Sequence, residues 1–295
     1  MSDGLSLRLA AFDWLSHQVE AHGDVLPWAV LQQGFDFQGA RVPLLSQQGI
    51  FKPRLLALPL SIRTAAGGPY DDVSQGSVLL YRYRGTDPFH RDNRGLREAM
   101  RQHVPLVYFH ALEPGRYMAS WPVYVVGDDP AGLTFTVQVD SAVYPLPETA
   151  DFDLGEPRRE YVTATFRRRL HQAAFRERVL SAYRERCAMC RLRHRELLDA
   201  AHIVADRDLA GEPRISNGLS LCKLHHAAFD NLFVTVDPDY RVVVRRAVLE
   251  EKDGPMLRHG LQELHGVSIG LPRRVEWRPS REGLEERLGR FRRAG

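Results

Sequence analysis

The 295-residue chain has only three cysteines, and all of them lie between residues 187 and 222. So few and so closely grouped thiols argue against a disulfide framework. No apolar run approaches the roughly 18 residues that a membrane helix needs, and no basic and then apolar leader begins the chain. We therefore expect neither a membrane span nor a secretory signal, and we expect a cytoplasmic protein.

Lysine is also scarce, because Lys52, Lys223 and Lys252 are the only lysines among 40 basic residues. Arginine, which makes up the rest, grips phosphate oxygens with two parallel hydrogen bonds. Residues 1–156 carry 12 basic and 18 acidic residues, whereas residues 157–295 carry 28 and 19. A coding preference for arginine would also explain the arginine count, so it is the asymmetry of −6 against +9 that indicates a nucleic-acid partner.

Cysteine and histidine occur in two short pairs. Cys187 and Cys190 stand in C-A-M-C, and Cys222 and His225 stand in C-K-L-H. This spacing is typical of a structural Zn²⁺ site, because two residues between ligands allow a tight knuckle to aim both side chains at one point. The 31 residues between the pairs exceed the roughly 12 of a DNA-reading finger. We predict a zinc ion that holds a larger insert together; three buried free thiols are the alternative.

Two runs of sequence lie between and after these pairs. L-L-D-A-A-H-I-V indicates a strand that ends at His202, and N-G-L-S-L-C-K-L-H-H-A-A-F-D indicates a turn feeding a helix. His202, Asn217 and His226 occur in the order found in HNH nucleases, which residues 183–245 resemble. The resemblance implies a ββα-metal fold in which His202 is the general base and His226 binds the catalytic Mg²⁺ or Mn²⁺. It also implies that Asn217 either orients a loop or completes the metal shell.

The chain departs from that pattern at one position. Many HNH proteins have an acidic metal ligand directly before the first histidine, and this chain has Ala201 there. Asp199 lies three residues before His202, an odd spacing that predicts the opposite strand face and makes it a poor substitute. Asp230 lies four residues after His226, on the same helical face, and is our candidate for a further metal ligand or a partner of His226. A local hydrogen bond at the helix end would explain Asp230 equally well.

Residues 163–186 have apolar side chains at helical spacing with arginines between them, which predicts an amphipathic helix leading into the zinc knuckle. Its arginines either follow phosphates or form a solvated face. The preceding residues 143–157 are rich in proline and acids, as in a linker. We predict a domain with an N-terminal helix at 1–142, a helical linker at 143–162, and a metal-binding domain with the leading helix at 163–295.

The first half contains a second informative passage, residues 67–100. Paired glycines and an acidic turn precede a strand in which Tyr81 and Tyr83 share one face and Arg82 and Arg84 the other. An ordinary hairpin with capping aspartates is the alternative to a binding site. Further strands are expected at 104–111, 117–127 and 133–140.

This passage resembles the SRA (YDG) domains, which bind DNA bearing modified cytosine by flipping the base into a pocket. The residues that match are Asp71, Asp72, Val73, Gly76, Tyr81, Asn93, Arg94 and Leu96. The resemblance spans about residues 25–142 and implies an SRA/PUA-like barrel in which Tyr81 stacks on the base and Asp72 accepts from its amino group. Tyr70 follows one residue after the place of the second stacking aromatic.

Six arginines lie within residues 82–101 of this otherwise acidic half. We predict that they contact the DNA backbone, with a solvated strand face as the alternative. The set is Arg82, Arg84, Arg91, Arg94, Arg97 and Arg101.

Together these patterns predict an α+β protein with an N-terminal β-rich SRA/PUA-like barrel, a helical linker and a C-terminal zinc-stabilised ββα-metal (HNH) domain. We predict a modification-dependent restriction endonuclease, a phosphodiester hydrolase that reads 5-methylcytosine or 5-hydroxymethylcytosine in double-stranded DNA. Because one such site cuts one strand, we expect a homodimer, with two proteins that meet on DNA as the alternative. The alternatives are a non-catalytic reader of modified DNA, and an HNH nuclease whose first domain senses another modification or RNA.

Overall fold

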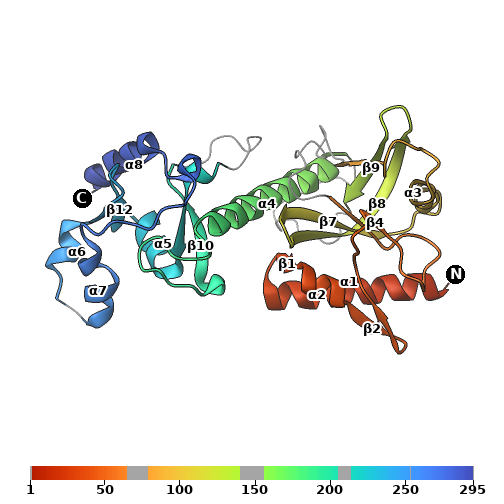
Figure 1. Ribbon diagram of the computed structural model, residues 1–295, viewed down its shortest axis with the longest axis horizontal. Helices are drawn as coiled ribbons and strands as arrows, with labels where there is room; N and C mark the ends of the chain where they lie inside the picture. Colours follow the sequence, from red (N-terminus) through yellow and green to blue (C-terminus); the bar gives the residue numbers. More distant parts are fainter. Residues whose placement is uncertain (1, 65–78, 140–155, 205–213, 253, 295) are drawn as a thin grey trace. The chain divides into compact units, whose positions relative to one another are not determined.

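The computed structural model describes residues 2–64, 79–139, 156–204, 214–252 and 254–294. The chain divides into two compact units, Met1–Ala173 and Ala174–Gly295, and helix α4 (Glu156–Ala182) crosses that boundary (Figure 1). The helix predicted from residue 163 therefore starts at least seven residues earlier, and residues 143–155 of the expected linker lie outside the described ranges. Within the described ranges no helix is long and apolar enough to cross a membrane.

The first unit is built on one sheet of seven strands with helices beside it (Figure 1). The strand order is β4-β5-β7-β8-β9-β6, with β1 also pairing with β8, and the described strands curl into a half-barrel. The elements are α1 (Ser2–His22), β1 (Val25–Pro27), α2 (Trp28–Gln33), β2 (Phe35–Phe37), β3 (Ala40–Val42), β4 (Ile50–Phe51), β5 (Ser61–Arg63), β6 (Leu79–Arg82), α3 (Arg91–Arg101), β7 (Leu106–Glu113), β8 (Arg116–Asp129) and β9 (Thr134–Val139).

The two faces of this sheet bury different kinds of side chain. Val107 and Phe109 of β7 belong to an apolar core that also contains Leu7 and Leu15 of α1. Because side chains alternate along a strand, Tyr108 and His110 point to the other face, and both are buried there. The sheet thus has an apolar face toward α1 and a second face on which aromatic and polar groups are buried.

The strands predicted for the first half are confirmed as β7, β8 and β9. The predicted alternation is confirmed too, since Tyr81 and Tyr83 are buried while Arg82 is exposed. The described strands form a half-barrel and do not close on themselves, so the SRA/PUA-like barrel remains a prediction.

The second unit contains a β-hairpin with a short helix beside it (Figure 1). Strand β10 (Leu198–His202) pairs antiparallel with β11 (Gly218–Cys222), and α5 (Lys223–Asp230) contacts both. The other elements are η3 (Arg195–Leu197), η4 (Ile215–Asn217), β12 (Val234–Val236), β13 (Val242–Val244), α6 (Arg246–Glu250), α7 (Pro255–Gly260), η5 (Gln262–Leu264), η6 (Val275–Trp277) and α8 (Arg281–Ala294).

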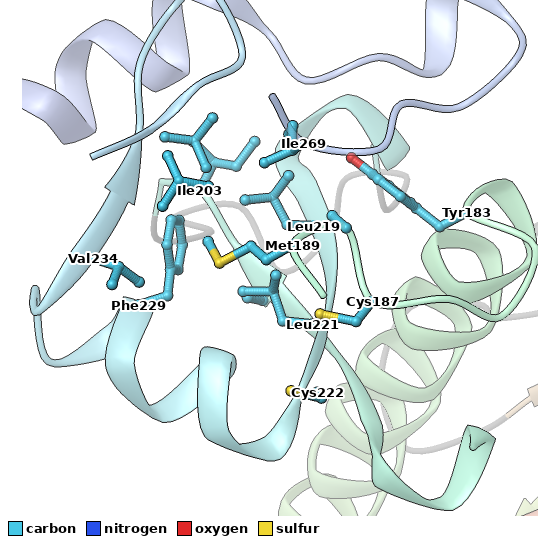
Figure 2. Packing of buried hydrophobic residues seen from close by; sticks show 14 of the residues in the cluster. Tyr183, Cys187, Met189, Ile203, Leu219, Leu221, Cys222, Phe229, Val234 and Ile269 are labelled. Carbon is cyan, nitrogen blue, oxygen red and sulfur yellow. The ribbon is translucent and has the colours of Figure 1, made fainter. Parts of the chain in front are cut away.

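The strand predicted to end at His202 is confirmed, but the interpretation of the next run was partly wrong. Residues Gly218–Cys222 form a strand that is buried throughout, and only then does the helix begin. Leu219 and Leu221 of this strand join the core of the unit with Met189 and Phe229 (Figure 2). The hairpin is therefore fixed on the side of α5 by apolar packing.

Candidate functional site

The three cysteines and His225 form one cluster. Their ligand atoms all lie within 4.8 Å of one another, and in the described part of the chain this is the only such group of three or more His, Cys, Asp or Glu residues. The Cys190 and Cys222 sulfurs are 3.9 Å apart, and Nδ1 of His225 lies 3.4 Å from the Cys187 sulfur and 3.1 Å from the Cys222 sulfur. Sulfurs about 2.3 Å from a tetrahedral ion would be about 3.8 Å apart. The spacing therefore fits zinc.

Local backbone structure accounts for this convergence. The Arg191 amide donates to the carbonyl of Cys187 at 3.0 Å, which closes the knuckle, and Cys222 is the residue before α5. His225 lies in the first turn of α5, and its Nε2 is 2.8 Å from the carbonyl of Gly260 at the end of α7. A ring that donates from Nε2 presents the Nδ1 lone pair to the sulfurs, the arrangement expected of a zinc ligand.

The electrostatics of the cluster also suit a cation. Hydrogen bonds with Cys190 and Cys222 lower the pKa of the Cys187 thiol far below its usual value. Burial alone would lower the pKa of His225, but its contacts with the thiolate groups outweigh burial and raise that pKa to about 10. Positive charge is thus favoured at the centre of a mostly buried group of thiols, where Zn²⁺ would supply it.

His226 projects from α5 between two carboxylates. Its Nδ1 lies 3.5 Å from Oδ2 of Asp199, and its Nε2 lies 3.2 Å from Oδ2 of Asp230. The predicted pairing of His226 with Asp230, four residues later on one helical face, is present in the structure. A divalent ion placed here would have one nitrogen and one oxygen ligand, and Mg²⁺ commonly retains several waters beside one or two protein ligands.

His202 lies at the end of β10 and packs against α4. Its ring is parallel to that of Phe175, with an interplanar angle of 10° and centroids 3.9 Å apart. Across the hairpin it pairs with Gly218, where a Cβ atom would lie 2.4 Å from Val179 and 2.9 Å from the Phe175 ring. The absence of a side chain at residue 218 thus allows the close approach of α4 that orients His202.

Asn217 holds the chain that follows His202. Its side-chain oxygen accepts from the Val204 amide at 3.0 Å, and its side-chain nitrogen donates to the Val204 carbonyl at 2.9 Å. Of the two roles considered for Asn217, loop orientation is the one for which the structure provides contacts.

The predicted base pocket is described only in part, because Tyr70 and Asp72 lie outside the described residues. Tyr81 is 6% exposed and meets the ring of Tyr108 edge to face, with centroids 5.7 Å apart. The ring of Tyr108 in turn lies 4.0 Å from that of His110, and Ser120 is the cross-strand partner of Tyr108. The sequence did not indicate the contact of Tyr81 with Tyr108, because the two residues lie on different strands.

Four of the six arginines predicted to contact the DNA backbone differ clearly in their surroundings. Arg82 and Arg94 are exposed, whereas Arg84 is paired with Asp92. The side chain of Arg97 is 17% exposed, and its guanidinium contacts Asp128 at 2.5 Å and the Tyr83 hydroxyl at 3.0 Å. Arg97 therefore stabilises the first unit from within.

Arg287 of α8 is a further residue that sequence reasoning missed. It is 9% exposed, and it donates to the carbonyl of Ile203 at 3.1 Å and to the carbonyl of Phe229 at 2.5 Å. Its guanidinium also lies 3.5 Å from the centre of the Phe229 ring. Because Ile203 follows His202 and Phe229 precedes Asp230, one side chain connects the ends of β10 and α5. No local sequence pattern predicts a contact between residues that are 84 positions apart.

A comparison with known protein families bears on the residues of this site. The family model of HNH endonucleases matches residues 187–237, so the chain carries an HNH endonuclease domain there. No curated protein matches the chain.

Two solved structures are similar to it over most of its length. The "Modification dependent TagI restriction endonuclease" is 16% identical, with 79% of this chain and 81% of that chain covered and a TM-score of 0.30. The "Type IV phosphorothioation-dependent restriction endonuclease ScoMcrA" is 14% identical, with 78% of this chain and 50% of that chain covered and a TM-score of 0.21.

Proposed function

We propose that the protein is a modification-dependent endonuclease that hydrolyses DNA phosphodiesters near a modified cytosine. The HNH match to residues 187–237, in which His202 lies at the end of β10 and His226 and Asp230 lie on α5, carries the hydrolytic half of this proposal. Recognition of the modified cytosine is supported by the resemblance of residues 67–100 to SRA domains and by the buried aromatic group around Tyr81.

His202 is the proton acceptor in this proposal. A phosphodiester repels hydroxide, so water has to lose its proton next to the phosphorus, and an imidazole is well suited to take it near neutral pH. The Phe175 ring fixes the plane of His202, and Asn217 and Arg287 hold the chain directly after it. A divalent cation bound at His226 and Asp230 would neutralise the charge that develops on the phosphate.

The reading step depends on balanced energies. Flipping a paired base costs a few kcal/mol, and stacking on an aromatic side chain returns about 1 to 3 kcal/mol per base. A methyl group in an apolar recess adds about 0.8 kcal/mol. Tyr81 would stack on the base, Asp72 would accept from its amino group, and Tyr70 would lie on the other face. Arg82 and Arg94 would contact the flanking phosphates.

A digestion panel tests both halves together. The protein with Mn²⁺ or Mg²⁺ is incubated with duplexes carrying cytosine, 5-methylcytosine, 5-hydroxymethylcytosine or N6-methyladenine. We expect cleavage of one or both modified-cytosine duplexes and none of the plain duplex. Equal cleavage of all duplexes would favour an HNH nuclease whose first unit senses something else. Binding without cleavage, at protein concentrations that saturate the DNA, would favour a non-catalytic reader. Ala201 is consistent with such a reader, because many HNH proteins have an acidic metal ligand at this position.

The residue assignments are tested by variants. His202→Ala should abolish cleavage while the affinity for modified DNA stays unchanged, because the base touches only the reacting water. His194→Ala is the matched control, since His194 is exposed and lies outside the site. Asp72→Ala should reduce discrimination between modified and plain DNA with cleavage chemistry intact. Normal cleavage by His202→Ala would refute the assignment of the base.

Duplex cleavage by a single-strand cutter requires two active sites. We propose a homodimer, or two molecules that meet on DNA. Sedimentation of the protein with and without modified duplex distinguishes these, since a dimer in both samples supports the first arrangement.

A further inference from the structure

The register of the β10–β11 hairpin shows which face of the hairpin carries Asp199. The two pairs Asp199–Leu221 and Ala201–Leu219 lie on one face, and the His202–Gly218 pair lies on the other. Asp199 lies three residues before His202 and therefore lies on the same face as Ala201. At the position of Ala201 the HNH pattern has its acid. Comparison with His202 alone made Asp199 look misplaced.

The contacts of Asp199 argue against direct metal binding. Its Oδ2 is 2.5 Å from Nζ of Lys223, and its Oδ1 is 3.4 Å from Nε of Arg176. Both carboxylate oxygens of Asp199 therefore already face cations. A dication bound at the same oxygens would be repelled by both of them.

The remaining contact of Asp199 is with His226. A neutral imidazole has one N–H and one lone pair, so the partner of one nitrogen determines what the other can do. Each ring nitrogen of His226 faces a carboxylate: Nδ1 lies 3.5 Å from Asp199 and Nε2 lies 3.2 Å from Asp230. A divalent ion bound at Nε2 beside Asp230 would leave the N–H on Nδ1, where it faces Asp199. Histidines that bind metals commonly have this outer carboxylate partner.

We propose that Asp199 is a positioning residue: it accepts from Nδ1–H of His226 and so keeps Nε2 as the nitrogen that binds the catalytic ion beside Asp230. This inference rests on the proposed function, because the metal role of His226 is part of that proposal. Asp199 thereby acts on the metal site through His226. It lies on the strand face where Ala201 provides no carboxylate.

The tautomer of His226 is the first measurement. The full-length, zinc-loaded protein is labelled with ¹⁵N-histidine and studied by NMR at pH 8 with added Mg²⁺, with the His226 signals assigned by their loss in His226→Ala. We expect the Nδ1–H form in the native protein and a shift toward the Nε2–H form in Asp199→Ala. Lys223→Met is the matched control, because Lys223 contacts Asp199 without contacting His226, and it should keep the Nδ1–H form.

The second measurement is the affinity for Mn²⁺, obtained by titration followed by electron paramagnetic resonance. Asp199→Ala should weaken Mn²⁺ binding about 10- to 100-fold at unchanged zinc content. Lys223→Met should not weaken it, because it removes a positive charge. Weaker Mn²⁺ binding by Asp199→Ala with an unchanged tautomer would mean that only its charge acts, and this would overturn the positioning role.

Two further variants separate this inference from the proposed function. If His226→Ala and Asp230→Ala weaken Mn²⁺ binding but Asp199→Ala does not, only the positioning role fails. If neither His226→Ala nor Asp230→Ala weakens it, the proposed catalytic site itself is wrong.

Discussion

Single residues in this protein are fixed by contacts that their neighbours in sequence do not reveal. The spacing of the cysteines predicted the metal cluster because each pair is local, and only the fold had to bring the two pairs together. The contact of Asp199 with His226 could not be predicted, because it joins a strand to a helix that lies 24 or more positions further along the chain. The ion pair of Arg97 with Asp128 could not be predicted either, because it joins residues 31 positions apart.

At Gly218, the missing side chain can be tested directly. Gly218→Ala would place a Cβ atom 2.4 Å from Val179 and 2.9 Å from the Phe175 ring. We expect a loss of about 1 to 3 kcal/mol in the free energy of unfolding of the second unit, and lower cleavage as the Phe175 ring moves from His202. Gly283→Ala is the control, since its Cβ would meet Ile203 at an ordinary 3.5 Å. Equal unfolding free energies for the two variants would contradict this account.

His110 makes the stability of the first unit depend on pH. Burial lowers the pKa of His110 from 6.5 to about 3. The unfolded chain therefore takes up a proton between those values while the folded chain does not, so stability falls as pH drops below 6.5. This group alone should reduce the free energy of unfolding by roughly 2 kcal/mol between pH 7 and pH 5.

Urea titrations followed by tryptophan fluorescence measure this effect, because Trp14, Trp28 and Trp121 belong to the first unit and only Trp277 to the second. His110→Gln removes the titrating group, so the difference between pH 7 and pH 5 should shrink in that variant. An unchanged difference would assign the pH dependence to other groups.

Elements of the second unit were predicted unevenly. The end of β10 at His202 and the helix after it followed from hydrophobic pattern and length. Strand β11 was missed because a short, wholly buried strand has no polar alternation to identify it. The support that α7 gives to His225, and that α8 gives to the hairpin, comes from residues after the family match, where the sequence showed no chemistry.

The contribution of α8 can be measured at Arg287. Arg287→Met retains the apolar packing but leaves the buried carbonyls of Ile203 and Phe229 without this donor. We expect the second unit to lose about 1 to 3 kcal/mol of unfolding free energy, and cleavage to decrease. Arg290→Met is the control, because Arg290 pairs only with Glu286 at the surface of the same helix and should change stability by less than about 0.5 kcal/mol. Similar losses in both variants would show that helix charge, and not this contact, matters.

On the scale of the whole molecule, charge is distributed in the way that the proposed activity requires. The excess of basic residues belongs to residues 157–295, while the first unit exposes individual arginines such as Arg82 and Arg94. The sequence predicted this asymmetry fully, because net charge needs no fold. It could not predict which arginines remain available, since that depends on ion pairs formed in the folded chain.

Salt dependence of DNA binding tests the two exposed arginines. The double variant Arg82→Ala with Arg94→Ala should bind modified duplex more weakly, and the slope of log K against log[salt] should become less negative by about 2. Fluorescence anisotropy at several salt concentrations measures it. Arg54→Ala, at another exposed arginine of the same unit, should leave the slope unchanged. A change at Arg54 as large as that of the double variant would indicate unspecific attraction.

The adjacency of His225 and His226 on α5 has a thermodynamic consequence. One imidazole belongs to the sulfur cluster and the next faces Asp230, so an ion at either place restricts the same turn of helix. Two ligands that favour one conformation must favour each other by the same factor. Manganese or magnesium would then slow the escape of zinc to a chelator, and removal of zinc would in turn weaken the hold on the second ion.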